Sequence, residues 1–421
     1  MIYALILFVV TYVLMLALPK YRAHVALGSA AIFIVTGMLP AAEILPSIDF
    51  NVIMMIAGTM GIVTLFIESQ MPMRLADMII AKMPNVRWTI VALSLFAGII
   101  SAFVDNVATV LMVAPVALAI AKRLGMSPVS MIIAIAVSSN LQGAATLVGD
   151  TTSILLGGHA GMNFLDFFIF DGKPGMFFIV QIGAIISAIV LLWIFRKEKK
   201  PVESNTYTEV TDFFPSYLLI GMIVLLITAS FLPNMPSTIN GIICLTLMAI
   251  GLIRKCVKDG NTNSLKAVIN DIDWTTILLL TGLFMVIGGI SACGVIDALA
   301  NVIAGLGGGN VFIVYTIIVW ASVILSAFID NIPYTATMLP VAEGIALTMG
   351  IDPILLYFGL LSGATLGGNM TPIGASANIT GIGILRKAGH EVKNSDFLKI
   401  GIPFTLSAVI PAYIIIWLLY A

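Results

Sequence analysis

Long apolar segments recur along the whole chain and constrain its fold more than any other feature. Hydrophobic residues make up 60% of the sequence and charged residues only 10%, where a soluble domain usually carries about 25% charged residues. The mean hydropathy is +1.11. A helix needs roughly 20 apolar residues to cross a hydrocarbon core about 30 Å thick. We therefore expect an all-α polytopic membrane protein that has membrane lipid around it and no nucleic-acid partner.

The apolar segments predict about ten transmembrane helices. We place these crossings at residues 2–18, 23–40, 49–67, 128–157, 175–195, 213–231, 236–253, 272–290, 352–384 and 399–419. The first segment has no basic stretch before it and no small-residue cleavage site after it. We interpret it as a retained span and not as a signal peptide.

Two further apolar segments, 88–121 and 311–347, are too long for one ordinary span, and a polar Asp-Asn pair interrupts each of them. We interpret both as re-entrant hairpins that enter and leave on the same side of the cytoplasmic (inner) membrane. Basic residues favour cytoplasmic loops. With both chain termini outside, every basic residue except Lys173 lies on the cytoplasmic side. A single crossing in either segment would destroy this asymmetry.

An internal repeat relates the two halves of the chain. Residues 101–157 match residues 326–382 at a constant offset of 225 positions without a gap. The shared residues include both Asp-Asn pairs and several glycines and prolines, which mark matching breaks in the backbone. Examples are Asp105 with Asp330, Asn106 with Asn331, Pro115 with Pro340, Gly143 with Gly368, Thr146 with Thr371 and Gly149 with Gly374.

The repeat predicts two halves of opposite orientation. We divide the chain into an N-terminal repeat at 1–195, a cytoplasmic linker at 196–212 and a C-terminal repeat at 213–421. Each repeat holds an odd number of crossings plus one hairpin, so the second copy is expected upside down relative to the first. The helices at 128–157 and 352–384 contain runs of small and polar residues and are expected to be broken, as in many secondary transporters.

Four ionisable residues lie inside the apolar segments: Asp105, Asp150, Asp330 and Glu343. A carboxylate at the centre of a bilayer costs at least about 2.5–3.5 kcal/mol and needs a partner. None of the predicted spans contains an interior Lys or Arg. The partner is therefore expected to be a cation from solution, a proton, or backbone and amide donors.

The hairpin tips are the candidate cation site. Oxygen ligands suit a hard cation, so we expect Na⁺ to be bound at Asp105, Asn106, Asp330 and Asn331, with Na⁺ or H⁺ as coupling ion and no cofactor. The candidate substrate-binding residues are Thr109, Gly143, Thr146, Asp150, Thr151, Thr152, Thr335, Asn369, Thr371, Ser376 and Asn378.

Several of these residues have simpler interpretations. An Asp-Asn pair at a tip is also the residue type preferred for capping the following helix. Glu343, whose repeat counterpart is Leu118, is either a proton site or a residue that faces water. We interpret His159 as a surface residue rather than as part of a proton relay.

The motifs at 101–109 (Ser-Ala-Phe-Val-Asp-Asn-Val-Ala-Thr) and 366–378 (Leu-Gly-Gly-Asn-Met-Thr-Pro-Ile-Gly-Ala-Ser-Ala-Asn) resemble those of the ion transporter superfamily. The similarity is to its arsenite permease, NhaD-type antiporter and pink-eye P-protein branch, which is related to the divalent anion/Na⁺ symporters. The resemblance implies a homodimer with a scaffold domain and a mobile elevator domain. In the dicarboxylate symporters both tips read Ser-Asn-Thr and bind Na⁺, and the matching positions here are 105–107 and 330–332.

The sequence thus leads to a hypothesis of a Na⁺- or H⁺-coupled secondary transporter of a small inorganic or carboxylate ion. The alternative is a Na⁺/H⁺ antiporter that carries no other solute, which the acidic residues favour. An ion channel and an intramembrane aspartyl protease with Asp105 and Asp150 as its dyad are more remote alternatives.

Overall fold

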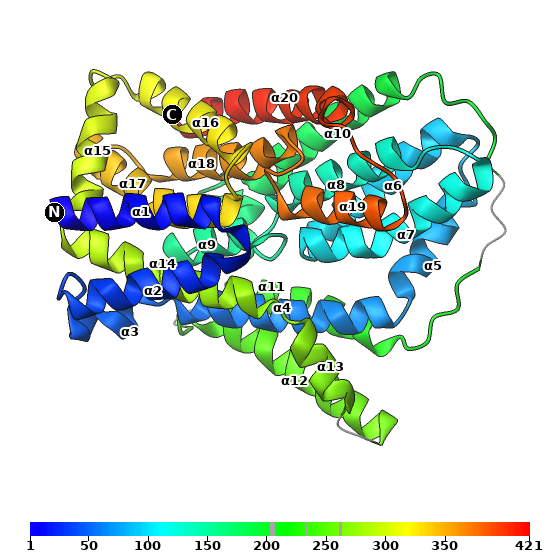
Figure 1. The fold of residues 1–421 in the computed structure, drawn as a ribbon, viewed down its shortest axis with the longest axis horizontal. Coiled ribbons are helices and arrows are strands. Elements are labelled where there is room, and N and C mark those ends of the chain that lie inside the picture. The colour runs from blue at the N-terminus through cyan, green and yellow to red at the C-terminus, as the bar shows by residue number, and fades with distance from the viewer. Residues whose placement is uncertain (203–206, 233–234, 261–262) are drawn as a thin grey trace.

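The computed structural model describes residues 1–202, 207–232, 235–260 and 263–421, and nearly all of its secondary structure is helical (Figure 1). The N-terminal half contains α1 (Ile2–Ala17), η1 (Pro19–Tyr21), α2 (Arg22–Val35), η2 (Ala41–Glu43), α3 (Ile44–Ser47), α4 (Phe50–Glu68), α5 (Met71–Ile80), α6 (Val86–Ser101), α7 (Asn106–Leu124), α8 (Val129–Gly143), α9 (Thr151–His159), η3 (Leu165–Phe167), the strands β1 (Ile169–Phe170) and β2 (Lys173–Pro174), and α10 (Met176–Ile194). The C-terminal half contains α11 (Phe214–Ser230), α12 (Ile239–Asp259), α13 (Asn263–Asp271), α14 (Trp274–Ala292), α15 (Val295–Leu306), α16 (Val311–Ser326), α17 (Asn331–Met349), α18 (Ile354–Gly367), η4 (Gly368–Met370), α19 (Ser376–Lys387) and α20 (Asn394–Tyr420).

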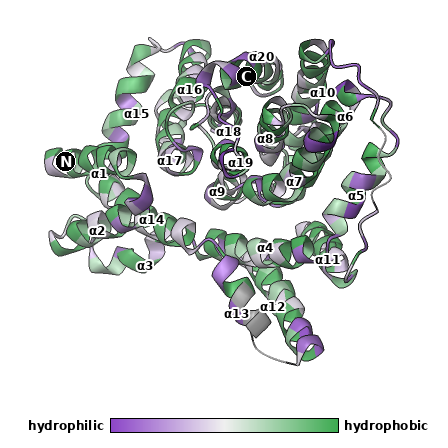
Figure 2. Ribbon diagram, turned by 45° about the vertical axis from the view of Figure 1, so that its right-hand side comes forward, coloured by the Kyte–Doolittle hydropathy of each residue, from purple (hydrophilic) through white to green (hydrophobic). Residues whose placement is uncertain are grey.

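The length and apolar character of these helices make the chain a multi-pass membrane protein. In the described residues six helical segments are long and apolar enough to cross a bilayer, or eight if each of two strongly bent helix pairs is one span. The bent pairs are α1 with η1 and α2, and α15 with α16, and each is bent by 116°. Apolar residues cover most helices, whereas the described residues between α10 and α11 include many hydrophilic ones (Figure 2). The number of about ten crossings stays a prediction.

Both predicted breaks and both predicted turns are present in the chain. α8 and α9 are separated by residues 144–150, and α18 with η4 is separated from α19 by residues 371–375. α6 and α7 are the counterparts of α16 and α17, and their ends lie 225 positions apart. The sequence analysis missed α5, α13 and α15. They are amphipathic and short, so a search for long apolar runs does not find them.

The helices pack in two groups. In the first group α4 packs against α12, α2 against α14 and α11 against α12, along the lower side of Figure 1. In the second group α6 packs against α8, α16 against α18 and α10 against α20. Within the second group the halves interlock, because α7 contacts α19 and α9 contacts α17. The two broken helices therefore lie against the turns of the opposite half.

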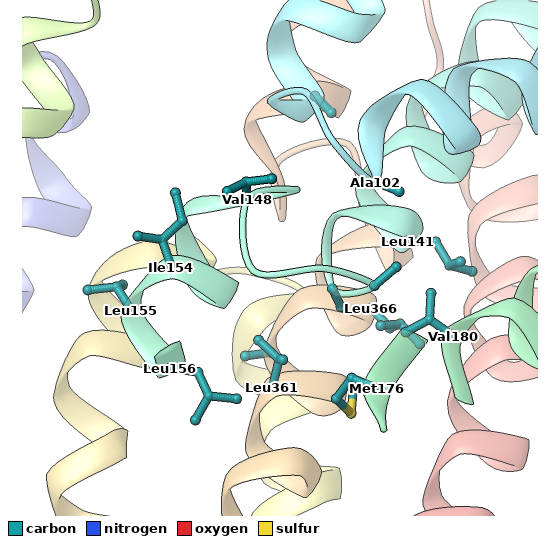
Figure 3. Packing of buried hydrophobic residues seen from close by; sticks show 14 of the residues in the cluster. Ala102, Leu141, Val148, Ile154, Leu155, Leu156, Met176, Val180, Leu361 and Leu366 are labelled. Carbon is teal, nitrogen blue, oxygen red and sulfur yellow. The ribbon is translucent and has the colours of Figure 1, made fainter. Parts of the chain in front are cut away.

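Apolar packing supports the first break. Leu141 lies in α8 before the break and Val148 lies within it, and both belong to one buried apolar cluster with Ile154, Leu366 and Met176 from three other helices (Figure 3). All five side chains are at most 3% exposed. Because apolar residues fill the space around the break, its freed backbone and polar side chains must find partners among themselves.

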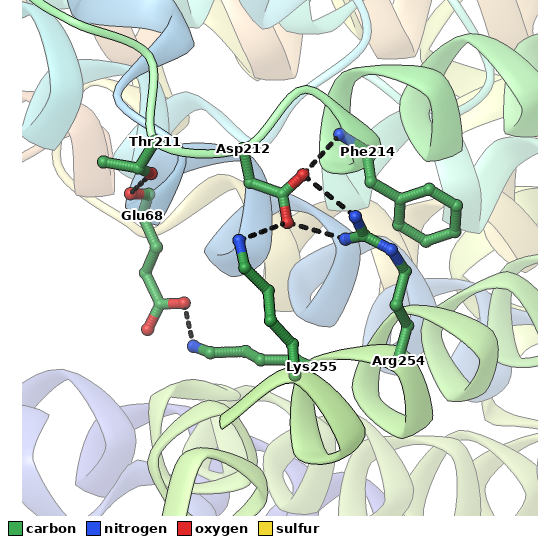
Figure 4. Close-up of polar contacts among 7 residues, drawn as sticks. Glu68, Thr211, Asp212, Phe214, Arg254 and Lys255 are labelled. Atoms are coloured by element: carbon green, nitrogen blue, oxygen red, sulfur yellow. Dashed lines mark hydrogen bonds and ion pairs between the residues drawn. The ribbon is translucent and has the colours of Figure 1, made fainter. Parts of the chain in front are cut away.

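An ion-pair cluster holds the end of the linker against the first group (Figure 4). Asp212 accepts a hydrogen bond from Arg254 Nη1 (2.6 Å), one from Lys258 Nζ (3.2 Å) and one from the N–H of Phe214 (3.0 Å). The hydrogen bond from Arg254 is the main cause that lowers the pKa of Asp212 to about 2. This cluster stabilises the end of the linker against α12.

Candidate functional site

The two predicted hairpin tips each place an aspartate immediately before a helix. Asp105 Oδ2 accepts hydrogen bonds from the N–H groups of Val107 (3.0 Å) and Ala108 (3.1 Å). Asp330 Oδ1 accepts one from the N–H group of Ile332 (3.1 Å). Both aspartates therefore cap a helix, which is the role that residue type alone predicts for them. Each carboxylate has a second oxygen that capping does not use.

Two threonines fasten the turns to the breaks. The Thr146 hydroxyl donates to the carbonyl oxygen of Ala102 in the first turn, and the Thr371 hydroxyl donates to that of Ala327 in the second. Both threonines are buried. These two residues, expected to bind substrate, are thus engaged in holding the backbone of the turns.

Two glycines allow the same close approach in both halves. A Cβ atom on Gly149 would lie 2.7 Å from the carbonyl oxygen of Gly143, and one on Gly374 would lie 2.6 Å from that of Gly368. Real Cβ atoms do not come that close to backbone oxygens. The shared glycines therefore reflect a packing requirement that the two breaks have in common.

A cavity of about 400 Å³ is lined by residues of both turns and both breaks. Six predicted site residues line it: Asp105, Asn106, Asp150, Thr151, Asn331 and Ser376. The other predicted substrate-binding residues are buried and do not line it: Thr109, Gly143, Thr146, Thr152, Thr335, Asn369, Thr371 and Asn378. The structure thus brings Asp105, Asn106 and Asn331 to one cavity, whereas Asp330 does not line it.

The wall of the cavity is acidic. Five carboxylates line it, from Glu68, Asp105, Asp150, Asp271 and Asp273. Among the described residues that line it there is no Lys, Arg or His. Of these five, Glu68 forms an ion pair with Lys255. The remaining acids leave an excess of negative charge around the space.

A buried hydrogen-bond network begins at the first turn. Asn106 Nδ2 donates to Asn140 Oδ1 (2.9 Å). Asn140 Nδ2 in turn donates to the carbonyl oxygen of Thr365 (2.7 Å) and to Asn369 Oδ1 (3.1 Å). Asn140 is fully buried and joins α8 to α18 across the two halves. The sequence analysis missed it, although positions 140 and 365 are matching repeat positions that are both polar within apolar helices.

The network continues to the second turn. The hydroxyls of Thr365 and Thr152 lie 2.9 Å apart, and Thr152 donates to Asp150 Oδ2 (3.0 Å). Asn331 Nδ2 donates to the same oxygen of Asp150 (3.3 Å). Asp150 Oδ1 caps α9 by accepting from the N–H of Thr151 (2.8 Å). A continuous polar path thus connects the asparagines of the two turns.

The second break is held by Asn378, which donates to the carbonyl oxygens of Gly368 (3.0 Å) and Thr371 (2.9 Å). Its counterpart Ser153 donates to the carbonyl oxygen of Gly143 (3.0 Å). Within the described part of the chain, four buried polar atoms of predicted site residues have no hydrogen-bond partner: Thr109 Oγ1, Thr335 Oγ1, Asn369 Nδ2 and Asn378 Oδ1.

One expectation about charge is wrong. The sequence predicted that no basic residue reaches the tip aspartates, but Arg22 Nη1 lies 2.7 Å from Asp330 Oδ2. Arg22 starts α2, 308 positions away along the chain. Arg22 lies in a short basic segment that was assigned to the cytoplasmic surface. It reaches the carboxylate of Asp330 because the start of α2 lies beside the second turn.

A second cavity, of about 330 Å³, lies at the opposite ends of α4 and α14. Asp49 before α4 and Ser291 near the end of α14 line it, together with His159 and Glu343. His159 Nε2 and Glu343 Oε2 lie 3.0 Å apart, and the His159 side chain is 23% exposed. His159 is at an exposed position, as its interpretation as a surface residue predicts, and it faces Glu343 across the two halves.

The fold is similar to those of two solved transporter structures. The YdaH transporter of Alcanivorax borkumensis matches with a TM-score of 0.61 over 96% of this chain and 97% of that chain, at 13% identity. MtrF of Neisseria gonorrhoeae, from a class of antimetabolite efflux pumps, matches with a TM-score of 0.59 over 92% and 83%, also at 13% identity. Such identities show the fold alone.

The sequence narrows this class. Residues 5–361 match the citrate transporter family CitMHS, and the chain belongs to that family. An uncharacterized transporter of Mycobacterium tuberculosis is 32% identical over 428 residues, which cover 99% of this chain and 98% of the relative. The human P protein is 22% identical over 486 residues, covering 96% of this chain and 57% of the P protein. The resemblance to the P-protein branch is confirmed. The chain is a transporter and not an enzyme, so the protease alternative is dropped.

Proposed function

We propose that this transporter couples the movement of a small carboxylate or inorganic anion to a gradient of Na⁺ or H⁺. The anion and the coupling cation both bind in the cavity of about 400 Å³. The observation that carries the proposal is the composition of the cavity wall. The carboxylates of Asp105 and Asp150 meet the amides of Asn106 and Asn331 there, without a basic residue among the described lining. A carboxylate at this depth needs a counter-charge, and oxygen ligands suit a hard cation or a proton.

The acidic residues that line the cavity favour binding of the cation before the anion. Asp105 and Asp150 both line the cavity, so an anion that enters alone meets like charge in a medium that screens it weakly. A cation at Asp105 removes part of that repulsion. The anion therefore binds after the cation, and obligatory coupling follows from electrostatics. The family description, which names citrate, supports a carboxylate as the solute.

The start of α19 is the part of the wall best suited to an anion. Helix N-termini carry partial positive charge and unpaired N–H groups. At the start of α9 the side chain of Asp150 occupies these groups, whereas the residue before α19 is Ala375, which has no capping side chain. Ser376 begins α19 and lines the cavity. We place the anion between Ser376 and the cation.

The two cavities support alternating access by an elevator movement. One lies at the Glu68 and Asp273 ends of α4 and α14, and the other at their Asp49 and Ser291 ends. We propose that the two repeats are inverted, that the second helix group moves against the first as a scaffold, and that the protein is a homodimer in the inner membrane. With both termini outside, the acidic cavity opens toward the cytoplasm.

Reconstitution tests this proposal. Purified protein in liposomes should accumulate labelled citrate under an imposed Na⁺ or pH gradient and not without one. Asp105→Asn should abolish accumulation, because the cation loses its charged ligand. Asp352→Asn is the matched control, since Asp352 also accepts a backbone N–H at a helix start (2.9 Å) but lies away from the cavity.

Two outcomes would contradict the proposal. One is the absence of gradient-driven uptake for citrate, phosphate, sulfate and arsenite alike. The other is proton movement driven by Na⁺ with no anion added, which would establish Na⁺/H⁺ antiport in its place.

A further inference from the structure

The second tip has a feature that the first tip lacks. Arg22 Nη1 and Asp330 Oδ2 form an ion pair of 2.7 Å, and the side chains are only 23% and 11% exposed. Beside it, the Tyr12 hydroxyl donates to the carbonyl oxygen of Pro333 (2.6 Å). The α1–α2 pair is thus docked on the start of α17 by two polar contacts, and Arg22 is held where it is.

Asp105 is in a different electrostatic position. It lines the acidic cavity, and among the ion pairs of the described residues none includes it. Asp330 does not line that cavity. Its two oxygens are both engaged, one by the Ile332 N–H and one by Arg22. The repeated Asp-Asn motif therefore has one tip open to a cation and one tip already neutralised.

We propose that Arg22 is a built-in counter-ion that takes the place of a cation at the second tip, so that the protein binds one coupling cation per chain, at Asp105. This inference rests on the proposed cation coupling. A charge-assisted hydrogen bond of this length between half-buried groups is strong. A monovalent cation at Asp330 would have to displace the guanidinium or lie next to its positive charge, and repulsion excludes the second arrangement.

Removing the guanidinium should therefore create a second site. The probe is sodium-22, and the measurement is the number of Na⁺ ions bound per chain in equilibrium dialysis of the purified protein. The wild type should bind one Na⁺ and Arg22→Gln should bind two. Arg22→Lys, which keeps the charge, and Lys20→Gln, which removes an exposed basic residue two positions away, should both match the wild type.

The decisive quantity is the difference between Arg22→Gln and the wild type. One additional Na⁺ in Arg22→Gln supports the inference even if the wild type binds none, in which case it is Na⁺ binding at Asp105, part of the proposed function, that fails. Equal numbers in the two proteins would overturn the inference.

A second variant keeps the test valid if Arg22→Gln does not fold. Asp330→Asn should leave the number of bound Na⁺ ions unchanged, because Arg22 and not Na⁺ occupies that carboxylate. Loss of one Na⁺ in Asp330→Asn would show that Asp330 is a cation ligand and would overturn the inference as well.

Discussion

The two turns are alike in backbone and different in charge. Each begins a helix with a capping aspartate, and each is fastened by a threonine hydroxyl to a carbonyl oxygen. Yet Asp105 faces the acidic cavity, whereas Asp330 is paired with Arg22. The comparison teaches that an internal repeat preserves the backbone of a site more faithfully than its electrostatics. The chemistry of the two tips has to be derived from what surrounds each of them.

The largest effects should come from the backbone features that the turns share. Gly149→Ala and Gly374→Ala each force a Cβ atom against a carbonyl oxygen, at 2.7 Å and 2.6 Å. We expect a loss on the order of 3 kcal/mol for either variant, because backbone atoms cannot move aside. Gly383→Ala, in α19 with no atom near its Cβ position, is the control and should be neutral or slightly stabilising. Thermal unfolding in detergent measures the stability of all three variants. A normal unfolding temperature for only one of the two variants Gly149→Ala and Gly374→Ala would show that the two breaks do not share this packing requirement.

The two matching positions of the hydrogen-bond network, Asn140 and Thr365, should contribute unequally to stability. Asn140→Ala removes three hydrogen bonds and leaves buried groups unpaired, so we expect a cost of about 2 kcal/mol. Thr365→Ala at the matching position removes only the contact with Thr152, because its carbonyl oxygen still accepts from Asn140, and should cost about 1 kcal/mol. Unfolding temperatures of the two variants check the order. Equal or reversed losses would show that Asn140 is not the centre of the network.

The threonine anchors should behave as a matched pair. Thr146→Val and Thr371→Val keep the shape and remove one hydroxyl donor to a turn carbonyl. Interhelical hydrogen bonds inside membranes are worth about 0.6 kcal/mol on average, so each loss should be about 1 kcal/mol or less. Both variants should retain gradient-driven uptake. If either variant folds normally but loses most of its uptake, that threonine binds substrate, as the sequence predicted.

The smallest effect should come from Asp212, which does not line the acidic cavity. Its folded-state pKa of about 2 is lower than the ordinary value of 3.8, so its contribution to stability is present above about pH 4 and is lost as the pH falls through 2. Asp212→Asn should therefore lower stability at pH 7 by less than about 1 kcal/mol, and the difference from the wild type should shrink below pH 4. Unfolding at pH 7 and pH 3 measures it. A pH-independent difference would mean that the carboxylate charge is not involved.

The repeat allowed much of this architecture to be predicted. Glycines and the Asp-Asn pairs mark places where a helix stops, and such constraints are local, so the breaks and turns follow from the sequence. The expectation that Pro115 and Pro340 mark breaks is wrong, because they lie inside α7 and α17. The cavity residues Asp105, Asp150 and Asn331 were found because polar groups inside apolar segments need partners.

Contacts between distant segments were not predictable in the same way. Arg22 lies in a short basic loop and meets Asp330 only because α2 packs beside the second turn. Asn140 is uncharged and its counterpart is Thr365, so identity at the 225-residue offset does not reveal it. His159 and Glu343 have no matching pair in the repeat. In each case the partner is chosen by tertiary packing, which residue type and spacing do not encode.

The most direct test of the account compares the two tip aspartates in one assay. The measurement is the initial rate of gradient-driven citrate uptake into liposomes by Asp105→Asn and by Asp330→Asn. Loss of the charged cation ligand at the first tip should cost on the order of 3 kcal/mol, so Asp105→Asn should be slower than the wild type by about 100-fold or more. Asp330→Asn should keep gradient-dependent uptake, because Arg22 already neutralises that carboxylate. Equal losses in the two variants, or full uptake by Asp105→Asn, would contradict the account.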